Sequence, residues 1–135
     1  SVNKRHFRTK SRRRIALESA LLGGMEFFHE GRGVFMAVPI SLMERLGATE
    51  NDAEDLSTLA GMVEDVDCGA VLRELKPDQW KLSLRTGANG RVNATRVCQL
   101  LGGGGHAMAA GATLKGGLEE VKALVLEAVD KVKRE

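Results

Sequence analysis

The stretch Trp80-Lys81-Leu82-Ser83-Leu84-Arg85 alternates apolar with polar side chains, as a strand with one buried face does. The alternation turns its three apolar side chains toward a core and aims Arg85 outward at the end of the strand. A shorter apolar run, Ala70-Val71-Leu72, comes before it, and the turn-forming cluster Lys76-Pro77-Asp78 lies between the two. The two runs therefore predict a β-hairpin.

Helix and strand patterns alternate on both sides of this hairpin. In chain order they predict an amphipathic helix from Ile15 to Phe28, a buried strand at 34–38, a short helix from Ser41 to Gly47, an acidic helical or irregular segment at 49–63, a helix from 94 to 101 capped by Asn93, a strand at 111–114 and a helix from 118 to 132. Ser41 with Glu44 forms a capping-box pattern, and Gly47 would end that helix. The fold class is therefore α/β (α+β), with a mixed β-sheet of about four to five strands flanked by helices.

Charge is distributed unevenly, although the net charge is only +2. Residues 1–14 carry seven basic side chains and no acidic one, so we expect a basic linker or N-terminal arm at 1–14 and a single folded domain at 15–135. Residues 79–118 carry five basic side chains and again no acidic one. Such an acid-free segment creates a local positive potential that attracts phosphate-bearing ligands.

Several classes of function are disfavoured by composition. No apolar run is long enough to cross a bilayer, and no apolar segment of signal-peptide type follows the basic N-terminus, so we expect a cytoplasmic protein without a membrane partner. Cys68 and Cys98 suggest buried small hydrophobic residues rather than nucleophiles. Carboxylates such as Asp52 with Glu54 are expected to be solvated, and no spacing of Asp, His and Cys predicts a metal site. The chain starts with Ser1, as a piece of a larger protein would.

The run Gly102-Gly103-Gly104-Gly105-His106 is the strongest functional signal, because glycine gives up the most chain entropy on folding. A P-loop is excluded because Ala112 and Thr113 follow Gly111 where Lys and Ser/Thr are required. A dinucleotide fingerprint must follow a strand, whereas a predicted helix precedes this run. The remaining functional interpretation is a loop whose backbone N–H groups face an anion at the start of a helical turn at 107–110, with His106 as a side-chain donor. The structural alternative is a flexible C-cap with a glycine linker and a merely exposed His106.

Several motifs together carry a family resemblance. Ser83-Leu84-Arg85-Thr86, a short loop, a helix, the glycine run and Ala109-Ala110-Gly111-Ala112 resemble the C-terminal DHH-associated domain, type 1, of the DHH phosphoesterases. The similarity is to the oligoribonuclease, 3′-phosphoadenosine-phosphate phosphatase and RecJ-like branch, and it extends more weakly over most of residues 12–135. Two positions depart from the family pattern: Thr86 stands where Ser is frequent, and Arg91-Val92 stands where Asp-Val is usual.

The resemblance implies a division of labour between two domains. Family members cut phosphoesters with two manganese ions held by an N-terminal DHH catalytic domain, whose Asp-His-His triplet is not in this sequence. We therefore expect a single C-terminal substrate-binding domain that has no catalytic or metal-binding residue and does not hydrolyse substrate alone. Its ligand would be a short oligonucleotide or a nucleotide phosphate. By position, the expected substrate-binding and phosphate-binding residues are Arg85, Thr86, Gly102, Gly103, Gly104, Gly105 and His106.

Two other classes of function stay open at this stage. A non-enzymatic RNA-binding module is one, since the C-terminal domain of alanyl-tRNA synthetase is similar and the basic arm could contact an RNA backbone. A dimerisation domain is the other, and a homodimer is compatible with either binding function. Deleting the arm, or measuring mass against concentration, would separate these possibilities.

Overall fold

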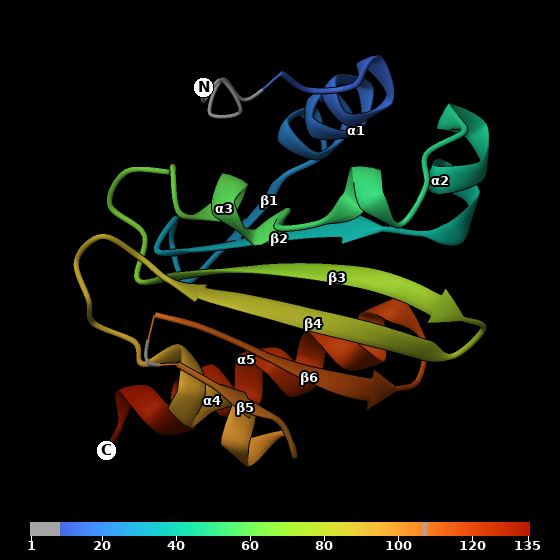
Figure 1. Ribbon diagram of the computed structural model, residues 1–135. Helices are drawn as coiled ribbons and strands as arrows, with labels where there is room; N and C mark the ends of the chain where they lie inside the picture. Colours follow the sequence, from blue (N-terminus) through green and yellow to red (C-terminus); the bar gives the residue numbers. More distant parts are fainter. Residues whose placement is uncertain (1–8, 107) are drawn as a thin grey trace.

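The computed structural model describes residues 9–106 and 108–135, which form one mixed sheet between two layers of helices (Figure 1). The strands lie in the order β1-β2-β3-β4-β6-β5. Their bounds are β1 (Glu26–Phe28), β2 (Gly33–Val38), β3 (Cys68–Lys76), β4 (Gln79–Thr86), β5 (Gly104–Gly105) and β6 (Ala109–Lys115). The α/β class is confirmed, with six strands instead of the expected four to five.

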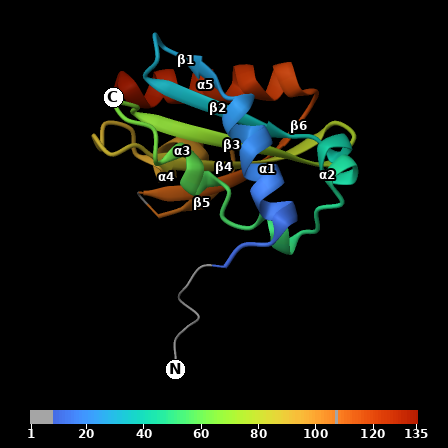
Figure 2. The same ribbon diagram turned by 90° about the horizontal axis from the view of Figure 1, so that it is seen from above.

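The helices divide between the two faces of the sheet. One layer contains α1 (Arg12–Gly23), α2 (Ile40–Leu46), the 3-10 turn η2 (Asn51–Ala53) and α3 (Ser57–Ala60). The other contains α4 (Ala94–Leu100) and α5 (Leu118–Lys133). Figure 2, seen from above, shows α1 lying across the strands and α5 running along the far side of the sheet. Within the described residues, no helix is long and apolar enough to span a membrane.

The predicted hairpin is confirmed and forms the centre of the sheet. β3 and β4 pair antiparallel, with Leu72 opposite Leu82, while β2 and β3 pair in parallel. Trp80, Leu82 and Leu84 are at most 5% exposed and join the core under α4 and α5. A second core lies between the sheet and α1 to α3, built around Leu17, Met36 and Val71 among others.

The N-terminal helix differs at both ends from the prediction. It ends at Gly23, where the N–H of Gly24 bonds Ala20 O at 3.0 Å, and residues 26–28 then form β1. Two successive glycines weaken a helix, and the apolar residues beyond them instead pair with β2. The helix begins at Arg12, inside the stretch expected to be an arm, because the Ser11 side chain caps it by accepting from Arg14 N. The basic residues at positions 1–8 lie outside the described residues.

Asp52 is buried, which corrects the expectation of a solvated carboxylate, and it joins α1 to the domain. Its side chain is 6% exposed and accepts hydrogen bonds from Thr49 N, Arg13 Nε and Ser11 Oγ, at 2.7–2.9 Å. These donors, the backbone bond from Thr49 foremost, hold the pKa of Asp52 well below its usual range. The acidic segment at 49–63 therefore serves in part as an anchor for the first helix.

The short helix after β2 starts differently from the prediction. α2 begins at Ile40, so Ser41 lies inside it and the expected capping box does not form. Extended Pro39 precedes the helix, and the carboxylate of Glu74 on β3 accepts from Ile40 N at 2.9 Å, satisfying an N–H that a cap would otherwise take. Gly47 ends α2 in the left-handed conformation, as predicted.

Candidate phosphate-binding face of the sheet

One half of the sheet carries no helical layer on the side of α1 to α3. In Figure 1, α3 reaches the Arg85 end of β4, and beyond it the described helices leave β4 and β6 uncovered, with α5 behind them. Strand alternation and register place the same set of positions on this surface, which we call the open face. The open face consists of Lys81, Ser83 and Arg85 on β4, Gly111, Thr113, Lys115 and Ala109 on β6, Gly104 on β5, and His106.

Arg85 and His106 lie in one row across three strands of the open face. Arg85 is opposite Ala109, and Ala109 exchanges two backbone hydrogen bonds with His106, at 2.8 and 3.1 Å. Side chains at directly paired positions point to the same side of a sheet, so Arg85 and His106 flank the small Ala109 side chain. The next row consists of Ser83, Gly111 and Gly104. Two predicted site residues far apart in sequence thus border a patch of nearly bare backbone.

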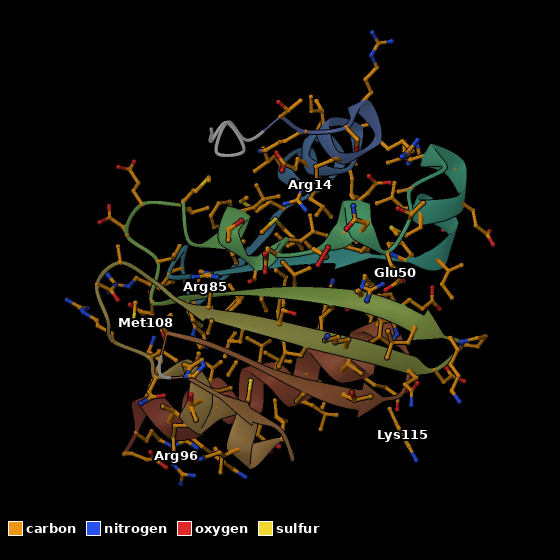
Figure 3. All side chains as sticks on the ribbon, viewed as in Figure 1. Arg14, Glu50, Arg85, Arg96, Met108 and Lys115 are labelled. Carbon is orange, nitrogen blue, oxygen red and sulfur yellow. The ribbon has the colours of Figure 1, made fainter. Side chains whose placement is uncertain are left out.

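One hydrogen-bond donor of the Arg85 side chain has no partner among the described residues. Its Nε is buried and makes no hydrogen bond within the described part of the chain. The side chain runs beside α3, where Gly61 leaves room for it: a Cβ at Gly61 would lie 2.7 Å from Arg85 Cδ. Figure 3 shows Arg85 next to α3, at the same end of the sheet as Met108. A buried, unpaired guanidinium donor beside an open surface is typical of a group that a ligand completes.

The first two glycines of the run end α4. Gly102 has φ +87°, and its N–H bonds Gln99 O at 3.1 Å, while Gly103 N bonds Cys98 O at 2.7 Å. This pair of bonds is a Schellman motif, which favours glycine at its left-handed position. A side chain at Gly103 would also collide with β6, because its Cβ would lie 2.0 Å from Gly111 O. The structural alternative of a C-cap is therefore confirmed for these two residues.

The other two glycines form β5, which excludes a flexible linker at this point. Gly105 has φ +148°, and its Cβ would lie 2.6 Å from the Cα of Ala110. Gly104 is different: its φ lies outside the left-handed region, and no described atom lies within 4 Å of its missing Cβ. That Cβ would stand on the open face, opposite Gly111. Gly104 is therefore the member of the run that neither conformation nor packing requires.

The helical turn expected at 107–110 is wrong for the residues that the structure describes. Ala109 and Ala110 belong to β6, and His106 closes a tight turn with Ala109; Ala107 lies outside the described residues. Pairing with β4 along the whole of β6 satisfies more backbone groups than a single helical turn could. Because His106 and Ala109 form a hydrogen-bonded pair, ladder alternation directs the N–H of Gly105 toward the open edge of β5. The N–H groups of Gly102, Gly103 and His106 bond carbonyls of the chain.

Thr86 is committed to the fold beside the site. It is 5% exposed; its hydroxyl donates to Val92 O at 2.7 Å and accepts from Ala94 N at 3.0 Å. These bonds tie the end of β4 to the start of α4 across the intervening loop. The hydroxyl that the family places here as Ser or Thr thus positions the strand that carries Arg85.

Asp67 is an organising residue that sequence patterns did not reveal. Its carboxylate is buried and accepts from Arg32, Lys133 and Asn89 at 2.7–2.8 Å. Burial alone would raise its pKa, but these three donors outweigh burial and hold the pKa well below its usual range. Asn89 in turn accepts from Arg91 N at 3.0 Å. These bonds therefore hold the loop after Arg85 in place. No sequence motif links Asp67 to its three donors, so its role could not be predicted from the sequence.

The remaining candidate groups are the two cysteines and the carboxylates and histidines that could serve as metal ligands. Within the described residues, no group of three or more His, Cys, Asp or Glu side chains could hold a metal ion. Both cysteines are buried as expected, and burial raises the pKa of Cys68 to about 12 and that of Cys98 to about 11. Thiols held in the neutral form are poor nucleophiles at neutral pH.

Comparison with known sequences gives a family match and a bacterial relative. A model of the DHHA1 domain matches residues 38–135. The bifunctional oligoribonuclease and PAP phosphatase NrnA of Thermus thermophilus is 41% identical over 103 residues, which cover 76% of this chain. The chain spans about 30% of the length of that relative.

Three solved structures share the fold. An exopolyphosphatase-related protein from Bacteroides fragilis superposes with a TM-score of 0.84 at 21% identity, covering 98% of this chain and 40% of the other. The pGpG-specific phosphodiesterase PggH from Vibrio cholerae gives 0.60 at 12% identity, covering 91% and 40%. The C-Ala domain of Aquifex aeolicus alanyl-tRNA synthetase gives 0.51 at 17% identity, covering 70% and 87%.

Proposed function

Because this chain belongs to the DHHA1 domain family, we propose that it is the substrate-binding part of a DHH-family phosphoesterase. The open face would hold the phosphate of a short oligonucleotide or of a nucleotide phosphate. The observation that carries this proposal is the single row of Arg85, Ala109 and His106 beside the bare backbone of Gly104 and Gly111. Two donors with nothing bulky between them suit an anion with several acceptor oxygens.

Each group has a distinct part in this proposal. Arg85 offers a charge-assisted hydrogen bond from a partly buried guanidinium, which is stronger than a neutral one. His106 is exposed at the rim and offers a ring N–H, while Gly105 N–H faces the strand edge. Gly104 lets the ligand approach the backbone. Thr86 and Asp67 hold the strand end and loop that keep Arg85 in position.

The chemistry of hydrolysis would come from a second domain. We propose that an N-terminal DHH domain of the same protein supplies two manganese ions, which neutralise charge and activate water. This chain would supply orientation, which can lower the barrier substantially because a fixed substrate has already lost its translational and rotational freedom. The chain alone would then bind substrate without cleaving it.

Calorimetric titration tests the binding proposal. We expect adenosine 3′,5′-bisphosphate or a dinucleotide to bind the wild-type chain, and Arg85→Ala and His106→Ala to weaken that binding at least about tenfold, equivalent to about 1.4 kcal/mol. Arg134→Ala and His29→Ala are matched controls, because Arg134 lies at the end of α5 and His29 pairs with Asp130 at 2.8 Å. Equal binding by all five proteins, or binding by none, contradicts the proposal.

A second candidate is an RNA-binding module of the kind suggested by the shared fold with the C-Ala domain. Under this alternative the basic residues at 1–8 contact an RNA backbone. Deleting residues 1–8, and not 1–14, is the appropriate test, because Ser11 and Arg13 anchor α1 to Asp52. If the chain without residues 1–8 loses its affinity for RNA but still binds a mononucleotide, the result favours RNA binding by the basic residues together with phosphate binding by the open face. A dimerisation role would instead give a mass that rises with concentration and no response to either ligand.

A further inference from the structure

Basic and hydroxyl side chains continue along the open face beyond the row of Arg85 and His106. Lys81 lies on β4 four residues from Arg85, opposite Thr113, and Lys115 lies opposite Gln79. All three of Lys81, Thr113 and Lys115 are exposed. Figure 3 shows Lys115 at the end of the sheet opposite Arg85 and Met108. Positive side chains thus occur at both ends of the same uncovered surface.

The neighbouring charges leave this surface positive. The segment 79–118, which supplies both β4 and β6, contains no acidic residue. Two carboxylates lie near Arg73 on β3 at this end of the sheet. That of Glu50 pairs with Arg73 at 2.7 Å, and Arg73 and, to a lesser degree, Lys81 lower its pKa. That of Glu74 accepts from Ile40 N at 2.9 Å. Arg73 stands opposite Lys81 in the register. The open face itself carries the basic side chains Lys81, Arg85 and Lys115 and no acidic one.

The spacing is too long for one nucleotide. A strand rises about 3.3 Å per residue, so Lys81 lies roughly 13 Å from the Arg85 row, and Lys115 lies roughly 20 Å from it. The phosphates of a single nucleoside bisphosphate cannot reach both ends of that distance, whereas successive phosphates of an extended single strand can. The hydroxyls of Ser83 and Thr113 lie between the cations as additional donors.

The open face also indicates how such a strand would be bound. The chain has no tyrosine, and its only tryptophan, Trp80, faces the buried core. Phe28 and Phe35 belong to the core side as well, and the exposed Phe27 lies on β1, at the other edge of the sheet. Apart from the ring of His106 at one end, the open face has no aromatic side chain among its described residues, so along β4 and β6 it offers contacts to the phosphate backbone in place of base stacking. Binding along it would depend strongly on salt and little on base identity.

We propose that Lys81 and Lys115, with Thr113 beside Lys81, form a track for the phosphates of a single-stranded oligonucleotide whose end phosphate lies at Arg85. This inference rests on the proposed function, and it narrows the ligand from any nucleotide phosphate to an oligonucleotide longer than a dinucleotide. The track would make affinity rise with length without changing the contacts of the end phosphate.

Titrations with unlabelled oligonucleotides test the track. The wild-type chain should bind a pentanucleotide more tightly than a dinucleotide, with adenine and uracil sequences alike. Each lysine contact to a single strand contributes about 0.7 to the slope of log K against log salt. The double variant Lys81→Gln, Lys115→Gln should therefore lower the pentanucleotide slope by about 1.4, remove the gain with length and keep the dinucleotide affinity. Both side chains are exposed, so its thermal unfolding should match the wild type.

The control is the double variant Lys131→Gln, Arg134→Gln, since both side chains are exposed at the end of α5 and the pair makes the same change of charge. It should keep the gain with length. A wild-type chain that binds both lengths equally, or a double variant that keeps the gain, overturns the track while the end-phosphate site stands. A wild-type chain that binds neither length overturns the proposed function and the track with it.

Discussion

Alanine substitution along the glycine run separates glycines that the fold requires from the one that a ligand would require. In Gly103→Ala the new methyl carbon would lie 2.0 Å from Gly111 O and 2.8 Å from the Cα of Ala112, both backbone atoms of β6. Overpacking typically costs about 1–3 kcal/mol, and a clash with backbone that cannot turn away belongs in the upper half of that range, at about 2 kcal/mol or more. With an unfolding entropy of about 2.1 cal/mol/K per residue, the 135 residues give about 0.28 kcal/mol per kelvin, so Tm should fall by at least about 7 °C.

Gly104→Ala should act in the opposite direction on stability. No described atom lies within 4 Å of the added methyl, and the backbone conformation is one that alanine accepts. Removing glycine's freedom from the unfolded chain stabilises a protein by about 0.4–1 kcal/mol, which corresponds to a rise in Tm of about 1–4 °C. The same methyl would stand on the open face, where the phosphate is proposed to lie. Affinity for adenosine 3′,5′-bisphosphate should therefore fall at least about tenfold.

Differential scanning calorimetry and titration calorimetry on the two variants measure both effects. The informative pattern is a Gly104→Ala chain that melts above the wild type yet binds more weakly. If this chain melts higher and binds as well as the wild type, the open space beside Gly104 does not serve a ligand. If it melts as low as Gly103→Ala, the packing argument itself is refuted.

Four further outcomes follow from the buried polar groups. Asp67→Ala should destabilise the chain by about 2 kcal/mol in urea unfolding, because it leaves Arg32 and Lys133 without their partner. An unchanged unfolding midpoint would contradict the organising role of Asp67. Asp67 and Asp52 both have pKa values lowered in the folded state. The stability that these carboxylates give the folded chain is therefore present above the ordinary carboxyl pKa of 3.8 and declines as pH falls below it. Asp67→Asn should consequently show a smaller loss of Tm on acidification than the wild type. Thr86→Val should cost about 1–3 kcal/mol by leaving Ala94 N and Val92 O unsatisfied, whereas Thr86→Ser should cost much less. Cys68 and Cys98 should react with a thiol reagent at pH 8 only in the unfolded protein, and rapid labelling of the native chain would show that one of them is accessible.

The sequence predicted the central elements well because their patterns are long and regular. The alternation at 80–85 and the helical period after Leu118 follow from burial of one face, and the apolar run at 34–38 follows from burial of both faces, which the structure confirms. The hairpin and its turn at 76–78 were predictable for the same reason. The class of the fold followed from the order of these elements.

The misassigned parts depend on contacts between residues distant in the chain. β1 and β5 are three and two residues long, too short for a period, and they exist because β2 and β6 offer unpaired edges. Ser41 was predicted to cap α2, but the carboxylate that satisfies Ile40 N comes from Glu74, 34 residues away. Asp52 looked solvated because its partners Ser11 and Arg13 precede it by about forty positions. Local pattern cannot report such partners.

The candidate site was predictable in its membership and only partly in its arrangement. Arg85 and His106 were singled out from sequence, and the register places them in one row through Ala109. The role of each glycine was not predictable, because the collision of Gly103 with β6 and the open space at Gly104 appear only when the strands are paired. Their binding role stays a prediction for the titrations above.

The four glycines of the run have different roles, and this difference affects how glycine runs in related domains should be interpreted. A descendant that had lost its ligand would still be held to glycine at 102, 103 and 105, since those positions serve the helix end and the strand contact. Position 104, together with His106 and Arg85, would then be free to drift. A preserved run of glycines is therefore a poor indicator of ligand binding in this fold. Replacement of the small residue at 104 is the change that would indicate a domain that no longer binds the ligand.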